Sequence, residues 1–134
     1  MYLLDTDICS YVIKRTHPEL IQQVMRFAPL QLKVSAVTVF ELEYGVQRSR
    51  NPRLGRIIQA FLQNVETLSF NSNAARESGA VRAELAAQGM IIGAYDLLIA
   101  GHARSVDAIL VTNNEREFSR VSQLEVENWA SSSG

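Results

Sequence analysis

Four acidic residues interrupt apolar segments of this chain, where an ionised carboxylate is costly unless it is paired or bound to a metal. They are Asp5, Glu41, Asp96 and Glu117. Each has an ordinary structural explanation when taken alone, since Asp5 could cap a helix and Asp96 could lie in a first helical turn. Four such acids in one short chain point instead to a shared site.

Carboxylates that gather at one site repel each other and take up protons, and a divalent cation removes that penalty. The chain has only two histidines and one cysteine. Hard oxygen ligands therefore favour Mg²⁺, with Mn²⁺ as the other possibility, over zinc. Such a cation lowers the pKa of a bound water and stabilises a phosphate under attack. The acids thus predict metal-assisted hydrolysis of a phosphodiester.

Short apolar runs alternate with helical patterns along the whole chain, which predicts an α/β fold with a mainly parallel sheet and helices on both faces. In such a sheet the active crevice lies beyond the carboxyl ends of the strands. Asp5, Asp96 and Glu117 would emerge at that edge, and the helix after the second strand would carry either Glu41 or Glu43 to it. We expect strands over 2–4, 32–35, 65–70, 108–111 and 124–126, and helices over 8–14, 18–27, 36–48, 52–62, 71–87, 94–104 and 115–121.

The composition bounds the class of protein. A length of 134 residues suits one domain over 1–134, of which residues 131–134 are expected to form a flexible tail. A hydrophobic content of 47% excludes a disordered chain, and a single cysteine excludes a disulfide framework. Apolar runs are too short to span a membrane, and we expect a cytoplasmic protein.

The charge is unevenly distributed. The formal net charge is −1, which by itself does not indicate a nucleic-acid-binding protein. Residues 1–64 nevertheless carry eight basic and five acidic residues, and the basic ones include four arginines within nine positions. A local basic patch can bind phosphates on a neutral domain. The candidates for holding a phosphate backbone are Lys14, Arg48, Arg50, Arg53, Arg56 and Asn114.

Four segments of the sequence, in order and covering nearly the whole chain, resemble the motif set of PIN-domain ribonucleases, in particular the VapC toxins of bacterial toxin–antitoxin modules. A resemblance in four motifs at once is far more specific than a resemblance in one. The segments are Leu3-Leu4-Asp5-Thr6-Asp7-Ile8, Val39-Phe40-Glu41-Leu42-Glu43-Tyr44-Gly45, Ile92-Gly93-Ala94-Tyr95-Asp96-Leu97-Leu98-Ile99-Ala100 and Leu110-Val111-Thr112-Asn113-Asn114-Glu115-Arg116-Glu117-Phe118.

This resemblance implies a PIN-like three-layer sandwich and an Mg²⁺-dependent endoribonuclease with four acidic positions. Carried over residue by residue, these are Asp5, Glu41, Asp96 and either Glu117 or Asn114, and we prefer Glu117 because a carboxylate binds the cation better than an amide. Asp5 and Asp96 would bind the metal directly, and Glu41 and Glu117 directly or through water.

The resemblance also implies partners. The segment from Arg116 to Trp129 is similar to the subgroup that cleaves initiator tRNA in its anticodon stem-loop. Family members associate as homodimers or larger assemblies and are inhibited by a VapB antitoxin. We expect Tyr11, Val12 and Phe61 to offer apolar surface that a partner covers.

Two other functions fit part of the sequence. Asp5-Thr6-Asp7 also fits a haloacid-dehalogenase-like phosphatase, in which Asp5 would be the nucleophile and Asp7 a general acid. However, Cys9 replaces the residue that this motif prefers, and the chain is short for a cap domain. The second alternative is a PIN-like module that binds an antitoxin or RNA without catalysis.

Overall fold

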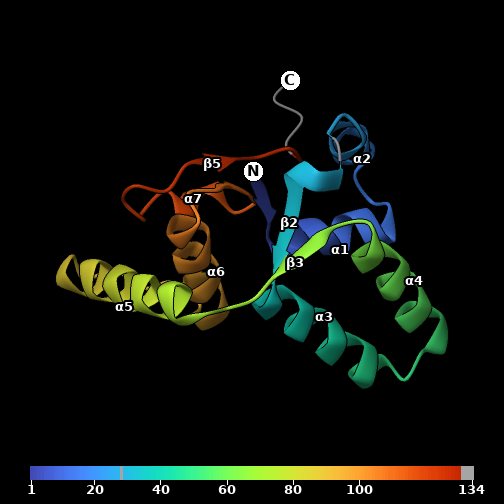
Figure 1. The fold of residues 1–134 in the computed structure, drawn as a ribbon, viewed down its shortest axis with the longest axis horizontal. Coiled ribbons are helices and arrows are strands. Elements are labelled where there is room, and N and C mark those ends of the chain that lie inside the picture. Colours follow the sequence, from blue (N-terminus) through green and yellow to red (C-terminus); the bar gives the residue numbers. More distant parts are fainter. Residues whose placement is uncertain (28, 131–134) are drawn as a thin grey trace.

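A computed structural model describes residues 1–27 and 29–130 of the chain, so the predicted tail over residues 131–134 lies outside the described part. Five parallel strands form one sheet in the order β3-β2-β1-β4-β5 (Figure 1). The elements in chain order are β1 (Tyr2–Leu4), α1 (Thr6–Lys14), α2 (Pro18–Met25), a short 3₁₀ turn (Pro29–Gln31), β2 (Leu32–Ser35), α3 (Ala36–Ser49), α4 (Pro52–Gln63), β3 (Glu66–Leu68), α5 (Ser72–Ala87), α6 (Ala94–Ser105), β4 (Ile109–Val111), α7 (Glu115–Phe118) and β5 (Val126–Glu127).

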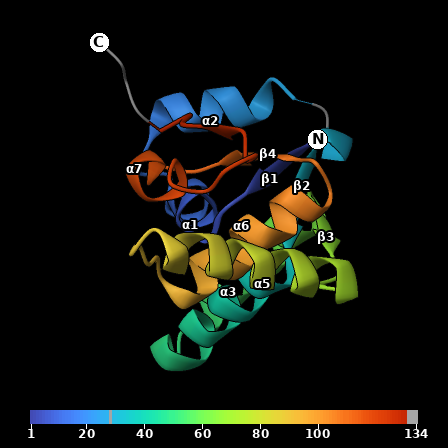
Figure 2. The same ribbon diagram turned by 90° about the vertical axis from the view of Figure 1, so that its left-hand side faces the viewer.

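The sheet divides the interior into two hydrophobic cores. Neighbouring residues of a strand point to opposite faces, and in β1 the side chain of Leu4 packs toward α1 and α2 while that of Leu3 packs toward α5 and α6. Both leucines are completely buried. Figures 1 and 2 show α1 and α2 on one side of the sheet and the α5–α6 pair on the other. The predicted three-layer α/β architecture is therefore confirmed.

Most predicted elements are present, with shifted ends. The helix predicted over 115–121 ends at Phe118, where the Ser119 hydroxyl donates to the Arg116 carbonyl and so competes with the helical pattern. The last strand lies at Val126–Glu127 instead of 124–126. Within the described residues, none of the helices combines the length and the apolar character that crossing a bilayer requires.

The carboxyl ends of the strands serve as helix starts. Asp5 accepts a hydrogen bond from the Ile8 amide and caps α1, and Ser35 at the end of β2 caps α3 through the Val37 amide. Polar capping side chains satisfy amides that the first helical turn leaves free. The same geometry places the beginnings of α1 and α3 at one edge of the sheet.

Helices α5 and α6 pack closely because Gly101 has no side chain. A Cβ atom at Gly101 would lie 2.5 Å from the Ser78 Cα and 2.7 Å from its amide nitrogen. Real Cβ atoms do not come this close to a backbone, so any other residue would push the helices apart. The contact fixes α6, the helix that carries Asp96.

We predict that Gly101→Ala lowers the free energy of unfolding by about 1–3 kcal/mol, because the added methyl group overpacks a rigid helix contact. Urea denaturation followed by circular dichroism measures the change. Gly79→Ala on α5 is the matched control, since a Cβ there meets nothing within 4 Å. It should leave stability unchanged or raise it by up to about 1 kcal/mol. Equal effects of the two substitutions would contradict the packing argument.

Candidate active site

Asp5 is held rigidly in the interior at the end of β1. The residue is 2% exposed. Its Oδ1 accepts from the Ile8 amide at 2.9 Å, and its Oδ2 accepts from the Thr112 hydroxyl at 2.5 Å. The Asp5 amide donates to the Val111 carbonyl at 3.0 Å, which ties the position to β4. Both oxygens of this carboxylate therefore have fixed directions.

Glu41 reaches the same region from α3 through a pair of threonines. The Thr6 hydroxyl donates to Glu41 Oε1 at 2.6 Å and lies 3.1 Å from the Thr38 hydroxyl. Thr6 directly follows Asp5, so this contact joins the start of α1 to the second turn of α3. Thr38 is fully buried and Glu41 is half-buried. The hydrogen bond from Thr6 therefore engages Oε1, one of the two carboxylate oxygens of Glu41.

Asp96 and Glu117 meet around Gly93, the residue that precedes α6. The Gly93 amide donates to Glu117 Oε1 at 2.8 Å, and the Asn114 side-chain amide donates to Glu117 Oε2. A Cβ at Gly93 would lie 3.5 Å from Asp96 Oδ2 and 3.9 Å from Glu117 Oε1. The missing side chain thus leaves a small space that both carboxylates face.

The acids interact electrostatically although they are far apart in the sequence. The pKa of Asp5 is raised to about 7, mainly by burial and to a smaller extent by the charges of Asp7 and Asp96, against the two hydrogen bonds, which lower it. Burial also raises the pKa of Asp96 to about 6, with contributions from Glu117, Asp7 and Glu41. Asp7 is exposed and still contributes to both values.

The chemistry of this donor set fits a hard divalent cation. Carboxylate oxygens are the ligands that Mg²⁺ prefers, and this ion is commonly bound through one or two carboxylates with several waters retained. In the described part of the chain, no three acidic, histidine or cysteine side chains are close enough together to hold a metal ion as they stand. The donors therefore suit a water-rich magnesium site better than a closed cage.

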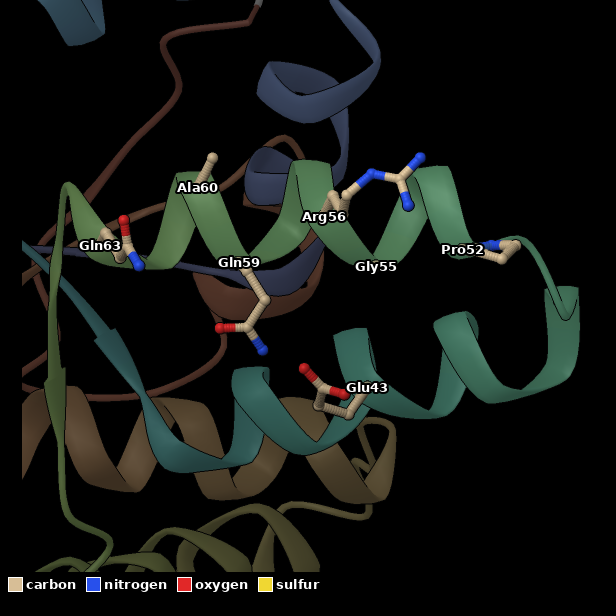
Figure 3. Close-up of a pocket in the computed structure, with 7 residues that line it drawn as sticks. All are labelled: Glu43, Pro52, Gly55, Arg56, Gln59, Ala60 and Gln63. Carbon is tan, nitrogen blue, oxygen red and sulfur yellow. The ribbon is translucent and has the colours of Figure 1, made fainter.

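The structure shows that Glu41, and not Glu43, lies near the other acids. The apolar pattern of the sequence alone had left this choice open. Glu43 lies on another face of α3 and lines a groove of about 430 Å³ between α3 and α4, together with Gln59 and Arg56 of α4. Figure 3 shows the side chains of Glu43 and Gln59 pointing into the space between the two helices. Glu41, in contrast, lies against Thr6 and acts on the pKa of Asp96.

The residues predicted to bind a phosphate backbone lie at separate places on the protein. Lys14 lines a second groove, of about 210 Å³, between α1, α3 and α4, and Thr6 and Glu41 lie at the same groove. The arginines are exposed at the far end of α3 and the start of α4 (Arg48, Arg50, Arg53 and Arg56). Asn114 is held by Glu117, so the two alternatives for the fourth position are neighbours, and Glu117 is the one that adjoins Asp96.

His102 of α6 lies in the core. It is 1% exposed, and its Nδ1 lies 2.7 Å from the Ser35 hydroxyl. Tyr11, Val12 and Phe61 pack against the hydrophobic core that α1, α2, α3, α4 and the sheet share, and they are partly exposed. That a partner covers them stays a prediction.

Thr6 and Thr112 are site residues that the sequence analysis did not single out. Both are adjacent to strand ends, Thr6 next to Asp5 and Thr112 directly after β4. A small hydroxyl residue at the carboxyl end of a parallel strand, beside an acid, is the signal that could have found them. Thr112 also accepts a hydrogen bond from the Asn114 amide at 2.9 Å and is fully buried.

Comparison with known proteins identifies the family. The sequence matches the PIN domain family over residues 2–124. It is 40% identical over 130 residues to the "tRNA(fMet)-specific endonuclease VapC" of Shigella flexneri, covering 96% of this chain and 98% of that protein. It is 43% identical over 129 residues to "Ribonuclease VapC2" of Haemophilus influenzae, covering 96% and 97%.

Solved structures agree. VapBC2 from Rickettsia felis, bound to a DNA fragment from its promoter, superimposes with a TM-score of 0.90 at 36% identity over 96% of this chain and 98% of the other. DNA-bound VapBC from Salmonella typhimurium also gives 0.90, at 38% identity over 96% and 97%. The chain belongs to the PIN domain family and, within it, to the VapC ribonucleases. This membership favours the ribonuclease prediction over the phosphatase alternative.

We predict that Asp5→Asn stabilises the metal-free protein at pH 8. The folded pKa of about 7 exceeds the ordinary value of 3.8, so folding favours the protonated acid. Stability is therefore lost as the pH rises from about 4 to 7. The gain should be on the order of 2–4 kcal/mol at pH 8 and vanish near pH 4. Urea denaturation with a chelator present measures it, and Asp107→Asn, in an exposed turn, should show no such dependence.

We also predict that Thr112→Val lowers the free energy of unfolding at pH 8 by about 1.5–3 kcal/mol, because a buried carboxylate loses a hydrogen-bond donor. The loss should shrink at pH 5, where Asp5 is protonated, and Thr112→Ser should restore most of the stability. Denaturation curves of the three proteins at the two pH values provide the measurement. An equal loss for Val and Ser would mean that packing alone matters at this position.

Proposed function

We propose that this chain is the toxin of a toxin–antitoxin module and acts as an Mg²⁺-dependent endoribonuclease. One observation carries the proposal: Asp5, Glu41, Asp96 and Glu117 come from four separate segments, and the burial and charges around Asp5 and Asp96 raise the pKa of both. Such an arrangement is costly for folding and is useful when a divalent cation binds. The identity to VapC ribonucleases supports the reaction class.

In this proposal, Asp5 and Asp96 bind Mg²⁺ directly, and Glu41 and Glu117 do so directly or through water, with Mn²⁺ as an alternative. The bound cation supplies a water of lowered pKa and offsets the charge of the phosphate. Thr112 and the Ile8 amide fix the direction of Asp5. Thr6 fixes Glu41 so that its second oxygen can orient the attacking water. The Gly93 and Asn114 amides do the same for Glu117.

The proposed substrate is RNA, and in particular initiator tRNA cut in its anticodon stem-loop. The support for the tRNA is the 40% identity to the Shigella flexneri protein, whose name gives tRNA(fMet) as its target. The anticodon stem-loop as the place of the cut is what the resemblance in sequence implies. Arg48, Arg50, Arg53 and Arg56 would bind the RNA backbone as sequence-independent phosphate contacts. Arg48 is seven residues after Glu41 on α3, which places its Cα about 10 Å along the helix axis from that of the acid.

The proposed partner is a VapB-like antitoxin. The groove between α1, α3 and α4 ends at Thr6 and Glu41, has Lys14 on its wall and contains Ile13, Leu42, Leu54 and Ile58. An antitoxin segment with apolar side chains and an acidic group for Lys14 fits this surface and would block access to Glu41. The VapBC complexes of related proteins support such an assembly, which we propose to be built on a homodimer or larger unit.

We predict that the purified protein cleaves total tRNA only when Mg²⁺ or Mn²⁺ is present, and that Asp5→Asn and Asp96→Asn each abolish cleavage. Mapping of the new RNA ends identifies the target and the cut site. Asp107→Asn, in an exposed turn before β4 and therefore at the opposite end of that strand from the acids, should keep wild-type activity. Calorimetric titration with Mg²⁺ should give binding to the wild type and none to Asp5→Asn.

The outcomes separate this proposal from its rivals. Cleavage of tRNA in the presence of a chelator, or full activity of Asp5→Asn, would contradict the metal site. Binding of RNA without cleavage under all metal conditions would instead indicate a catalytically silent PIN module.

A further inference from the structure

The turn that carries Glu117 has a fixed orientation in the structure. Phe118 of α7 is completely buried, and Glu115 at the start of the helix accepts a hydrogen bond from the Asn128 side-chain amide at 2.9 Å. The Arg120 amide donates to the Glu117 carbonyl at 3.3 Å, so a helical type of turn continues past the end of α7. Side chains three residues apart lie on the same side of such a turn. Arg120 is therefore placed beside Glu117.

A hydrogen bond fixes the Arg120 guanidinium at the edge of the acidic site. Its Nη1 donates to the Ile91 carbonyl at 3.1 Å. Ile91 lies two residues before Gly93, whose amide donates to Glu117 Oε1 at 2.8 Å. The segment that leads to Asp96 is thus contacted by the arginine and, two residues later, by the acid. The guanidinium consequently lies near the two carboxylates that face Gly93.

Arg120 keeps donors that its contact with Ile91 does not use. A guanidinium has five N–H donors in a planar fork, and the Ile91 carbonyl accepts from one nitrogen. The residue is exposed, and within the described part of the chain its side chain forms no ion pair. Arg104, in contrast, is paired with Glu77 and Glu84 and ties α6 to α5. The other donors of Arg120 can form the paired hydrogen bonds that guanidinium groups make with phosphate oxygens.

We propose that Arg120 binds a phosphate of the RNA strand next to the one that is cut. The inference rests on the proposed ribonuclease function and adds a substrate contact to that same site. A phosphate contact holds the strand in register without reading its sequence. Arg120 reaches the site from α7, whereas the arginines considered above lie on α3 and α4.

Charge explains why a cation is useful at this edge. The acids repel a phosphate group that approaches them, and a bound divalent cation acts on the scissile phosphate. A guanidinium beside Glu117 attracts the neighbouring phosphate. Because Arg120 bonds to a backbone carbonyl and pairs with no carboxylate of the described chain, it leaves the oxygens of Glu117 and Asp96 to the metal.

A purely structural role is the rival explanation of Arg120. In that case the side chain would only hold the segment before Asp96, and its loss would weaken metal binding without removing a contact to RNA. The salt dependence of RNA affinity distinguishes the two roles. Each phosphate contact releases counterions and contributes about 0.7–0.9 to the slope of log Kd against log salt concentration.

The test measures binding of a fluorescein-labelled stem-loop RNA, with the sequence of the initiator-tRNA anticodon arm, to protein inactivated by Asp5→Asn. Anisotropy at several salt concentrations gives the Kd and its slope. Arg120→Gln, added to the inactive protein, should weaken binding about tenfold at low salt and lower the slope by about 0.7–0.9. Arg120→Lys keeps the charge but not the fork, so it should keep the slope and give an intermediate Kd.

Two further measurements complete the test. Arg76→Gln is the matched control, since it removes the same charge from an exposed arginine that bonds to Asn73 near the start of α5, and it should change neither Kd nor slope. Calorimetric titration of Arg120→Gln with Mg²⁺, in protein that retains Asp5, should give the wild-type affinity.

An unchanged slope in Arg120→Gln would overturn the phosphate contact, and a loss of Mg²⁺ affinity alongside it would assign the structural role instead. An equal fall in Arg76→Gln would also overturn it, because any surface charge would then suffice. Failure of the wild-type protein to cleave total tRNA with Mg²⁺ would overturn the proposed function itself. Cleavage by the wild type, together with an unchanged slope in Arg120→Gln, would remove the arginine contact alone.

Discussion

The burial of acidic side chains at one edge of the sheet, to which their mutual repulsion adds, is the constraint on which the candidate site depends. Asp5 is almost completely buried, and its two hydrogen bonds do not offset the cost of burying its charge. Nearby acids add to that cost. A protein keeps such an unfavourable cluster when something positive relieves it, and a divalent cation is the simplest such partner. In the function proposed above, the stability lost in this way is the cost of a site for such a cation.

The fold delivers these acids to one place with little local specialisation. Parallel strands joined through helices bring all their carboxyl ends to the same edge. Asp5 follows β1 directly, Glu41 is one turn into the helix after β2, and Glu117 follows β4 by one loop. Asp96 does not follow a strand but lies on α6. The position of α6 depends on the close α5–α6 contact at Gly101. A substitution far from the acids can therefore misplace one of them.

The sequence predicted the layers and the alternation of strands and helices along the chain, because burial and chain connectivity dictate both. Asp5 stood out as an acid at the end of an apolar run. Glu41 and Glu43 could not be distinguished by pattern, because both have apolar neighbours, and only the hydrogen bond from Thr6 shows that Glu41 lies beside the residue that follows Asp5. Thr112 was overlooked since a threonine after a strand is ordinary until its partner is known. The contact of Arg120 with Ile91 and the half-burial of Tyr11 likewise depend on how the elements pack, which local periodicity does not encode.

The central claim is that acids distant in sequence bind one cation together, and an anomalous difference map from crystals soaked in Mn²⁺ tests it most directly. The account predicts a manganese peak at direct ligand distance from the carboxylates of both Asp5 and Asp96, with Glu41 and Glu117 around it. A well-ordered crystal in which manganese binds elsewhere, or contacts Asp5 and Asp96 at separate positions, would contradict it.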